Sequence, residues 1–316
     1  MSPFSPGRLL YLVWHRPRGW LANTRRMGGF REVWLTARGR NAMEAAAHRL
    51  PPVTVGAAAL EPDRPGLAFL TGRRLWFQTA FCLHTFLRHS AERPPVLIVS
   101  DGTLTANQSS TLARLFPGVV IESPSETLAR ITASLPPARY PTFHRLLPGH
   151  ILLQKLACIH PPDSPPRLFL DSDMLFQTRP IALDAWLHSP DRPMFMTDVV
   201  NAYGYPMDVL AELAGHAVPE RINTGVSAIP AGFLDWDRLD RWLNALVSTR
   251  GTSYYMEQAL FALATAGRPY IALDPHAYVV APDNTSARDA RGALHHYVNL
   301  SKAHYFRHAW RLAVTQ

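Results

Sequence analysis

Cysteine and lysine are both scarce in this chain. Cys82 and Cys158 are the only cysteines among 316 residues. Two cysteines cannot build the disulfide framework of a small secreted domain, and both lie in apolar helical patterns, where a free thiol behaves as a small hydrophobic group. Lys155 and Lys302 are the only lysines, so arginine supplies 30 of the 32 basic residues (32 − 2).

Long hydrophobic runs are absent as well. No stretch approaches the roughly 18 uninterrupted apolar residues of a membrane span. The apolar run at residues 9–14 is short and flanked by charge, without the cleavage site of a secretory signal. We therefore expect a cytoplasmic protein, with the inner face of the membrane as a candidate location because of the charge described next.

Acidic residues are rare at the start of the chain. Residues 1–50 hold nine arginines against Glu32 and Glu44, so this segment carries +7 (9 − 2) of the net charge of +8. Such a segment could lie on an anionic membrane surface, or it could pack on the main domain and show its arginines to water. We do not expect a nucleic-acid partner, because no recognisable reading motif accompanies the charge.

Short apolar runs alternate with helical patterns from Leu67 onward. Strands are predicted at 67–70, 96–99, 119–121 and 168–170, with helices between them. This alternation predicts an α/β fold, in which a mostly parallel central sheet carries helices on both faces. We place the main domain at residues 63–316 and a basic, helical N-terminal extension at 1–62.

Two carboxylates, Asp171 and Asp173, follow the apolar run 168–170. Ligands of open α/β sheets bind beyond the carboxyl ends of the strands, and charged groups there need a cation or a specific partner. Carboxylate oxygens suit Mg²⁺ or Mn²⁺ bound to a diphosphate. Because Asp-x-Asp is also common in turns and at helix N-caps, the pair alone leaves both interpretations open.

Other candidate binding residues lie elsewhere in the chain. The Thr71-Gly72 loop follows the first strand, where a nucleotide would bind in such a sheet. Arg145 and Lys155 precede the Asp pair and could contact phosphate oxygens, although a surface role is the default for a lysine.

Four motifs occur in order along the chain: Leu170-Asp171-Ser172-Asp173, Asn223-Thr224-Gly225-Val226, Glu257-Gln258 and His296-x-x-Asn299-x-x-Lys302-Ala303-His304. This set resembles the motifs of the GT-A glycosyltransferases, enzymes that use nucleotide-sugar donors. The resemblance is closest to the glycogenin-like and bacterial lipopolysaccharide galactosyltransferase branch, and it covers about residues 65–306.

This resemblance implies a role for each motif. Asp173 and His296 would bind Mn²⁺ or Mg²⁺ directly, and Asp171 would contribute through water or hold the ribose and sugar. Lys302 would stabilise charge on the leaving diphosphate. Gln258 or Glu257 would face the anomeric carbon. Independently of the resemblance, Asn223 offers a donor and an acceptor to a sugar hydroxyl and Gly225 could allow close backbone approach, although Asn-Thr-Gly is also an ordinary turn. UDP is the implied nucleotide, because the resembling branches use it.

The chain departs from the family pattern at three places. Asn299 stands where the family has Gly, Ala303-His304 stands where it has Pro-Trp, and Glu257-Gln258-Ala259 replaces Asp-Gln-Asp. His296 and Lys302 keep the family spacing. His295 and His304 remain alternative metal ligands.

We therefore predict a metal-dependent glycosyltransferase that moves a sugar from a nucleoside-diphosphate sugar to a glycan, lipid-linked or other acceptor. A non-catalytic nucleotide-sugar-binding protein on the same fold is the first alternative. A haloacid dehalogenase-type phosphatase is more remote, because that family has Thr or Val where this chain has Leu175 and needs an acidic pair downstream.

Overall fold

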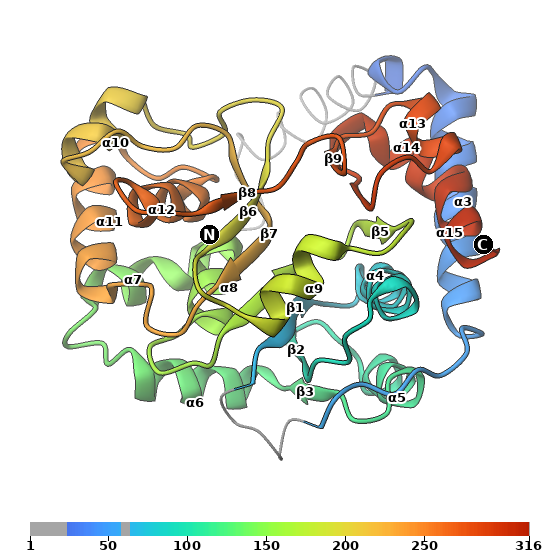
Figure 1. Cartoon of the computed structure of the whole chain (residues 1–316), viewed down its shortest axis with the longest axis horizontal. Coiled ribbons are helices and arrows are strands. Elements are labelled where there is room, and N and C mark those ends of the chain that lie inside the picture. The colour runs from blue at the N-terminus through green and yellow to red at the C-terminus, as the bar shows by residue number, and fades with distance from the viewer. Residues whose placement is uncertain (1–23, 58–63, 316) are drawn as a thin grey trace, which may run out of the picture.

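The computed structural model describes residues 24–57 and 64–315 (Figure 1). The apolar run at 9–14 lies outside these residues. Within the described ranges, no helix combines the length and the apolar character that crossing a membrane requires.

A seven-stranded sheet forms the centre of the molecule, with strand order β3-β2-β1-β4-β7-β6-β8. Neighbouring strands pair in parallel except at β7, which runs antiparallel to both β4 and β6. The predicted mostly parallel sheet is thus confirmed. The bounds are β1 Gly66–Thr71, β2 Val96–Ser100, β3 Val120–Glu122, β4 Arg167–Leu170, β6 Met194–Thr197, β7 Ile222–Ile229 and β8 Ile271–Ala272.

Helices cover both faces of this sheet, as predicted (Figure 1). Successive side chains of a strand point to opposite faces, so Ala68 and Phe69 of β1 enter two different apolar cores. One core includes α4 (Trp76–His89), α5 (Ala106–Leu115) and α9 (Ile181–His188). The other includes α6 (Pro124–Ser134), α7 (Pro141–Leu146), η2 (Leu147–Gly149), α8 (Ile151–Ile159), α10 (Met207–Ala214), α11 (Trp236–Arg250) and α12 (Met256–Thr265).

A small second sheet joins the middle of the chain to its end. Its order is β5-β10-β9, with bounds Met174–Phe176, Leu294–His296 and Tyr278–Val280. Strand β5 starts directly after Asp173, and its Met174 pairs with His296. The remaining C-terminal elements are α13 (Asn284–Asp289), η3 (Asn299–Ser301), α14 (Lys302–His304), η4 (Tyr305–Ala309) and α15 (Trp310–Thr315).

The described part of the predicted extension packs on the main domain. Helix α3 (Phe30–Ala47) contacts α4 and η4 and buries Met43 and Ala47 in the first core. Gly39 lies so close to the carbonyl of Phe306 that a β-carbon would not fit between them. The division of the chain at residue 62 remains a prediction.

Candidate functional site

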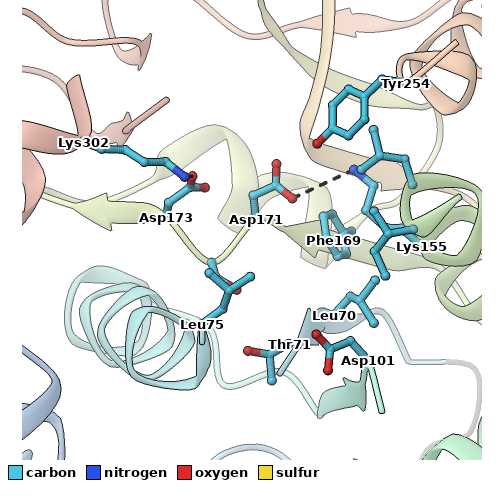
Figure 2. Close-up of a pocket in the computed structure, with 13 residues that line it drawn as sticks. Leu70, Thr71, Leu75, Asp101, Lys155, Phe169, Asp171, Asp173, Tyr254 and Lys302 are labelled. Atoms are coloured by element: carbon cyan, nitrogen blue, oxygen red, sulfur yellow. Dashed lines mark ion pairs between the residues drawn. The ribbon is translucent and has the colours of Figure 1, made fainter. Parts of the chain in front are cut away.

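Two cavities meet at the carboxyl end of β4. The first, of about 250 Å³, lies between the start of α4 and the Asp pair, and Figure 2 shows its lining. The second has a volume of about 340 Å³. Both are lined by Leu152, Lys155, Asp171, Asp173, Tyr254 and Lys302. The Asp pair therefore lies where a molecule extending through both cavities would pass.

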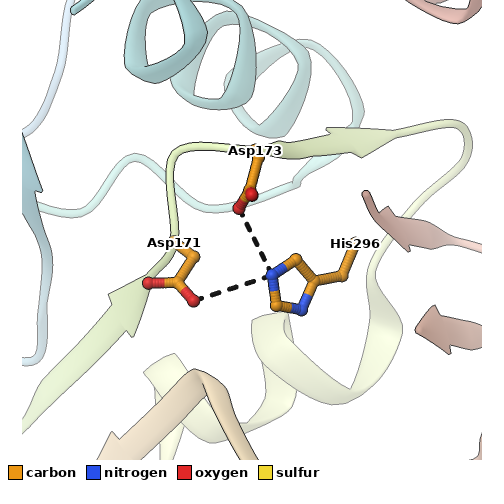
Figure 3. Close-up of side chains that lie close together, drawn as sticks. All are labelled: Asp171, Asp173 and His296. Atoms are coloured by element: carbon orange, nitrogen blue, oxygen red, sulfur yellow. Dashed lines mark ion pairs between the residues drawn. The ribbon is translucent and has the colours of Figure 1, made fainter. Parts of the chain in front are cut away.

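Asp171, Asp173 and His296 converge at this junction (Figure 3). His296 Nε2 lies 3.6 Å from Asp171 Oδ2 and 3.3 Å from Asp173 Oδ1. Three ligand atoms, one carboxylate oxygen from each aspartate and one ring nitrogen of His296, lie within 4.8 Å of one another. Two carboxylates and an imidazole form a suitable donor set for Mn²⁺, and the residues present fit such an ion.

The backbone around the Asp pair is hydrogen-bonded to both neighbouring sheets. The Asp171 N–H donates to the Gly225 carbonyl on β7 at 2.8 Å, and the Tyr297 N–H donates to the Asp173 carbonyl at 2.9 Å. Between them, the buried Ser172 hydroxyl is 2.8 Å from that of Thr79 on α4. Thr79 in turn donates to the Thr71 hydroxyl at 2.7 Å. The two carboxylates are therefore held by three separate parts of the fold.

Gly225 leaves the space that the His296 ring occupies. A β-carbon at this position would come within 2.7 Å of His296 Nδ1 and 2.8 Å of Met174 Cε. Such distances are shorter than any ordinary contact, so a side chain at 225 would displace the ring. The glycine of the Asn-Thr-Gly-Val motif is therefore explained by the close approach of His296.

Positive groups surround Asp173. Lys302 Nζ lies 2.9 Å from Asp173 Oδ2. Burial alone would raise the pKa of the Asp173 carboxyl, but the hydrogen bond and charge of His296, together with Lys302, outweigh burial and hold this pKa well below its usual range. Burial lowers the pKa of His296, and the Asp173 contact more than compensates, so the His296 pKa is raised.

Behind the Asp pair lies a buried ion pair. Lys155 Nζ is 2.9 Å from Glu257 Oε1, donates to the Thr224 carbonyl at 3.1 Å and lies 4.0 Å from Asp171 Oδ1. The Thr224 hydroxyl donates to Glu257 at 2.8 Å. Burial lowers the Lys155 pKa, but Glu257 and Asp171 outweigh it and raise this pKa. Lys155 thus places a positive charge beside Asp171.

The two residues at the start of α12 face different surroundings. Glu257 is fully buried and faces Lys155, whereas Gln258 lines the second cavity. The Gln258 Nε2 atom has no hydrogen-bond partner among the described residues. Of the two residues expected at the anomeric carbon, Gln258 is the one that faces the space where a sugar could bind.

The remaining predicted residues divide between the site and its surroundings. Thr71 lines the first cavity, and Asn223 and Gly225 line the second. Gly72 lines neither cavity but lies against the Asp101 side chain, because a β-carbon there would overlap the Asp101 carboxylate. Arg145 is exposed on α7 and lines neither cavity.

The alternative histidine ligands lie away from the carboxylates. His295 is buried and hydrogen-bonded to the Tyr297 hydroxyl at 3.1 Å and to the Arg291 carbonyl. His304 is half-buried, with its ring centroid 5.8 Å from that of His308. Neither joins the group formed with Asp171 and Asp173.

Asn299 explains one departure from the family pattern. Its φ angle is +50°, in the left-handed region that favours glycine. Asparagine is the residue after glycine that enters this region most readily, so the backbone turn between His296 and Lys302 can keep its shape.

Two acidic residues at the site, Asp101 and Asp198, were not among the predicted residues. Asp101 follows β2 and lines the first cavity, and Asp198 follows β6 and lines the second. The Asp198 carboxylate accepts a hydrogen bond from Asn223 Nδ2 at 2.8 Å. An acidic residue directly after a buried strand is the signal that identified Asp171, and applied to every strand it would have found both.

No protein-family model and no curated protein matches the chain. Among solved structures, mouse xyloside xylosyltransferase 1 is similar over 77% of this chain and 97% of its own, with 12% identity and a TM-score of 0.48. The WbbM bifunctional glycosyltransferase matches over 76% of this chain and 46% of its own, with 11% identity and a TM-score of 0.48. Galactosyltransferase LgtC, solved with donor and acceptor sugar analogues, matches over 79% of this chain and 95% of its own, with 13% identity and a TM-score of 0.47. All three are glycosyltransferases by name.

Proposed function

We propose that this protein is a metal-dependent glycosyltransferase that uses a nucleoside-diphosphate sugar, with UDP as the nucleotide. The observation that carries the proposal is the position of Asp171, Asp173 and His296 at the junction of two cavities. A donor with its nucleoside in one cavity and its sugar in the other would place its diphosphate at this junction. The acceptor is a hydroxyl of a glycan or a lipid-linked compound.

Transfer breaks the bond between the anomeric carbon and the diphosphate oxygen. A hydroxyl oxygen of the acceptor forms the new bond to this carbon, and the nucleoside diphosphate leaves with the bonding electrons. The departing diphosphate oxygen takes up the proton that the hydroxyl loses. A divalent cation held by Asp171, Asp173 and His296 would offset the charge that develops on the diphosphate. Lys302 lies beside Asp173 and can contact the same phosphate oxygens.

Other residues orient the sugar. Gln258 offers an amide N–H that has no partner in residues 24–57 and 64–315, and Asn223 lines the same cavity. Lys155 and Glu257 act from behind, because their ion pair fixes a positive charge 4.0 Å from Asp171 and limits how that carboxylate can turn. We assign Glu257 this positioning role and Gln258 the contact with the sugar.

Hydrolysis of the donor tests the proposal without knowledge of the acceptor. With UDP-galactose, UDP-glucose and UDP-xylose as probes, the wild type should release UDP only in the presence of Mn²⁺ or Mg²⁺. Asp173→Asn should abolish release. The matched control Asp191→Asn, at an exposed aspartate paired with Arg192, should retain it.

The outcomes also separate this proposal from a non-catalytic binding protein. Metal-dependent stabilisation of the fold by UDP without release of UDP from any donor would favour the binding protein. Release that persists without metal would contradict the metal-dependent mechanism.

Association with an anionic membrane remains a proposal for residues 1–50. On the described part of this segment, Trp34 is exposed, and the Arg38 guanidinium lies 5.5 Å from its ring centroid. Because Met43 and Ala47 belong to the core, removal of residues 1–23 and Trp34→Ala are better tests than deletion of the whole segment. Unchanged sedimentation with phosphatidylserine vesicles at low salt would contradict the proposal.

A further inference from the structure

The loop that follows β6 exposes two neighbouring valines. Val199 and Val200 keep 60% and 59% of their surface accessible, and both line the second cavity. Two successive apolar residues that face solvent beside a polar site need a functional explanation, because exposed apolar patches at grooves commonly bind ligands. No charged residue occurs between Val199 and Tyr205.

Hydrogen bonds hold this loop with its valines outward. Asp198 accepts from the Val199 N–H at 2.7 Å and from Asn223 at 2.8 Å. The Tyr203 hydroxyl donates to the Pro219 carbonyl at 2.6 Å and accepts from the Ile222 N–H at 2.9 Å. The loop is thus anchored on both sides of the valines.

A second anchor lies within the loop itself. The Asn201 side chain accepts a hydrogen bond from the Arg221 N–H at 2.5 Å. The Asn201 side chain is therefore bonded to the protein, whereas the neighbouring Val199 and Val200 expose apolar side chains that make no such bond.

An aromatic pair adds apolar surface to the same cavity. Tyr254 and Tyr255 are 66% and 42% exposed, and their rings pack edge to face with centroids 5.2 Å apart. Tyr254 also borders the first cavity, close to Lys155 and Asp171 (Figure 2). The second cavity therefore combines polar groups, including Gln258 and Asn223, with four exposed apolar or aromatic side chains.

We propose that Val199, Val200, Tyr254 and Tyr255 form an acceptor subsite for a compound with an apolar aglycone beside its attacking hydroxyl. This inference rests on the proposed function. Valine side chains offer no hydrogen bond to a sugar hydroxyl, whereas they contact an alkyl chain favourably. The four side chains would bind the apolar part of the acceptor, beside the donor sugar that Gln258 contacts.

Alkyl glycosides of increasing chain length provide the test. Methyl, butyl and octyl β-galactosides and β-glucosides are titrated, below their micellar concentrations, into the full-length protein with saturating UDP and Mn²⁺. The octyl compound should bind about tenfold or more tightly than the methyl compound, because each additional buried CH₂ group contributes favourably. In the double variant Val199→Ser/Val200→Ser, most of this difference should be lost.

A control valine separates the subsite from a general effect of hydrophobicity. Val120 on β3 is 46% exposed and lines neither cavity, so Val120→Ser should leave the chain-length dependence unchanged. Binding of UDP with Mn²⁺, measured in the same samples, reports the proposed function separately.

Three results would overturn the inference while UDP and Mn²⁺ still bind. They are the absence of binding by any of these glycosides, an affinity independent of chain length, and a chain-length dependence that the double variant retains. Failure of UDP and Mn²⁺ to bind would instead contradict the proposed function on which the inference rests.

Discussion

His296 packs its ring against the backbone of Gly225, where a β-carbon would lie 2.7 Å from the ring Nδ1 atom. Gly225→Ala should therefore displace the ring from Asp171 and Asp173. We expect Mn²⁺ affinity to fall by about 10- to 100-fold, as it does when the support of a metal ligand is lost. Isothermal titration with Mn²⁺ measures this change.

The control for this substitution is Gly149→Ala. A β-carbon at Gly149 would meet no atom within 4 Å, so this variant should bind Mn²⁺ like the wild type. Equal Mn²⁺ affinity in both variants would show that His296 is not a ligand.

Lys302 contacts the Asp173 oxygen at 2.9 Å and shares this carboxylate with the proposed metal ion. Removing the lysine charge in Lys302→Met should leave Mn²⁺ binding intact or strengthen it, because a competing cation is lost. UDP binding in the presence of Mn²⁺ should weaken by about tenfold, since a charge-assisted contact to phosphate disappears. Unchanged UDP affinity in a titration of this variant would exclude the phosphate contact.

The ion pair between Lys155 and Glu257 should contribute to stability as well as to the site. Both side chains are almost completely buried, so Glu257→Gln leaves the Lys155 charge without its main partner. We expect the free energy of unfolding to fall by about 3 kcal/mol in urea denaturation.

A double variant distinguishes a broken pair from a damaged core. Lys155→Met/Glu257→Gln removes the unpaired charge and should recover part of the stability lost in Glu257→Gln alone. If the stability lost in the double variant equals the sum of the losses in Lys155→Met alone and Glu257→Gln alone, the pair does not act as a unit.

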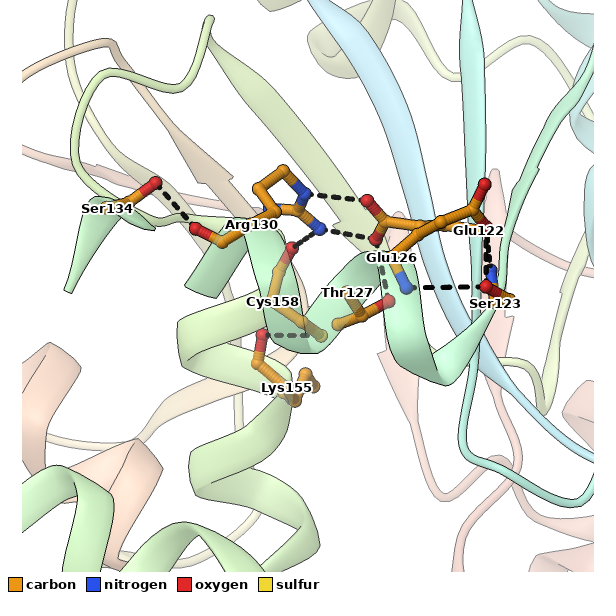
Figure 4. A network of polar contacts seen from close by, with 8 residues as sticks. All are labelled: Glu122, Ser123, Glu126, Thr127, Arg130, Ser134, Lys155 and Cys158. Carbon is orange, nitrogen blue, oxygen red and sulfur yellow. Dashed lines mark hydrogen bonds and ion pairs between the residues drawn. The ribbon is translucent and has the colours of Figure 1, made fainter. Parts of the chain in front are cut away.

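Glu122, which lies away from the site, should make the free energy of unfolding depend on pH. Figure 4 shows its carboxylate, which accepts bonds from Arg130 at 2.7 and 2.6 Å and from Thr127 at 2.8 Å. Burial raises the pKa of Glu122, but the bonds from Arg130 and Thr127 outweigh burial and lower it. A carboxyl whose pKa is lower in the folded state stabilises the protein above its unfolded pKa, near 4.3, and loses this contribution as the pH falls through the folded pKa.

Glu122→Gln should therefore lower the free energy of unfolding by about 1–2 kcal/mol at pH 7. The difference from wild type should shrink below about pH 4, where the wild-type carboxyl is protonated too. Glu126→Gln, at an exposed residue of the same network, is the control and should change stability little. A pH-independent difference between wild type and Glu122→Gln would contradict the assigned ion pair.

Strands β1, β2, β3 and β4 were predicted because each carries a local signal. The β4 strand reads as an apolar run that ends at Asp171, and β1 and β2 likewise end at polar residues. The small second sheet has no comparable signal. Its strands β5 and β10 have three residues each, and residues far apart in the chain pair there. His296 was predicted as a metal ligand from the spacing of the family motif alone.

Local sequence patterns specify the alternation of strands and helices, and with it the placement of Asp171 and Asp173 at a strand's carboxyl end. The neighbours of each site residue depend instead on how distant segments pack together. Consecutive residues of a helix point about 100° apart, so Glu257 and Gln258 cannot both face the same space. Packing of α12 turned Glu257 toward Lys155 and Gln258 toward the cavity. Pairing of β10 with β5 brings His296 to Asp173. Such long-range strand pairing depends on the whole fold, so no local sequence pattern predicts it.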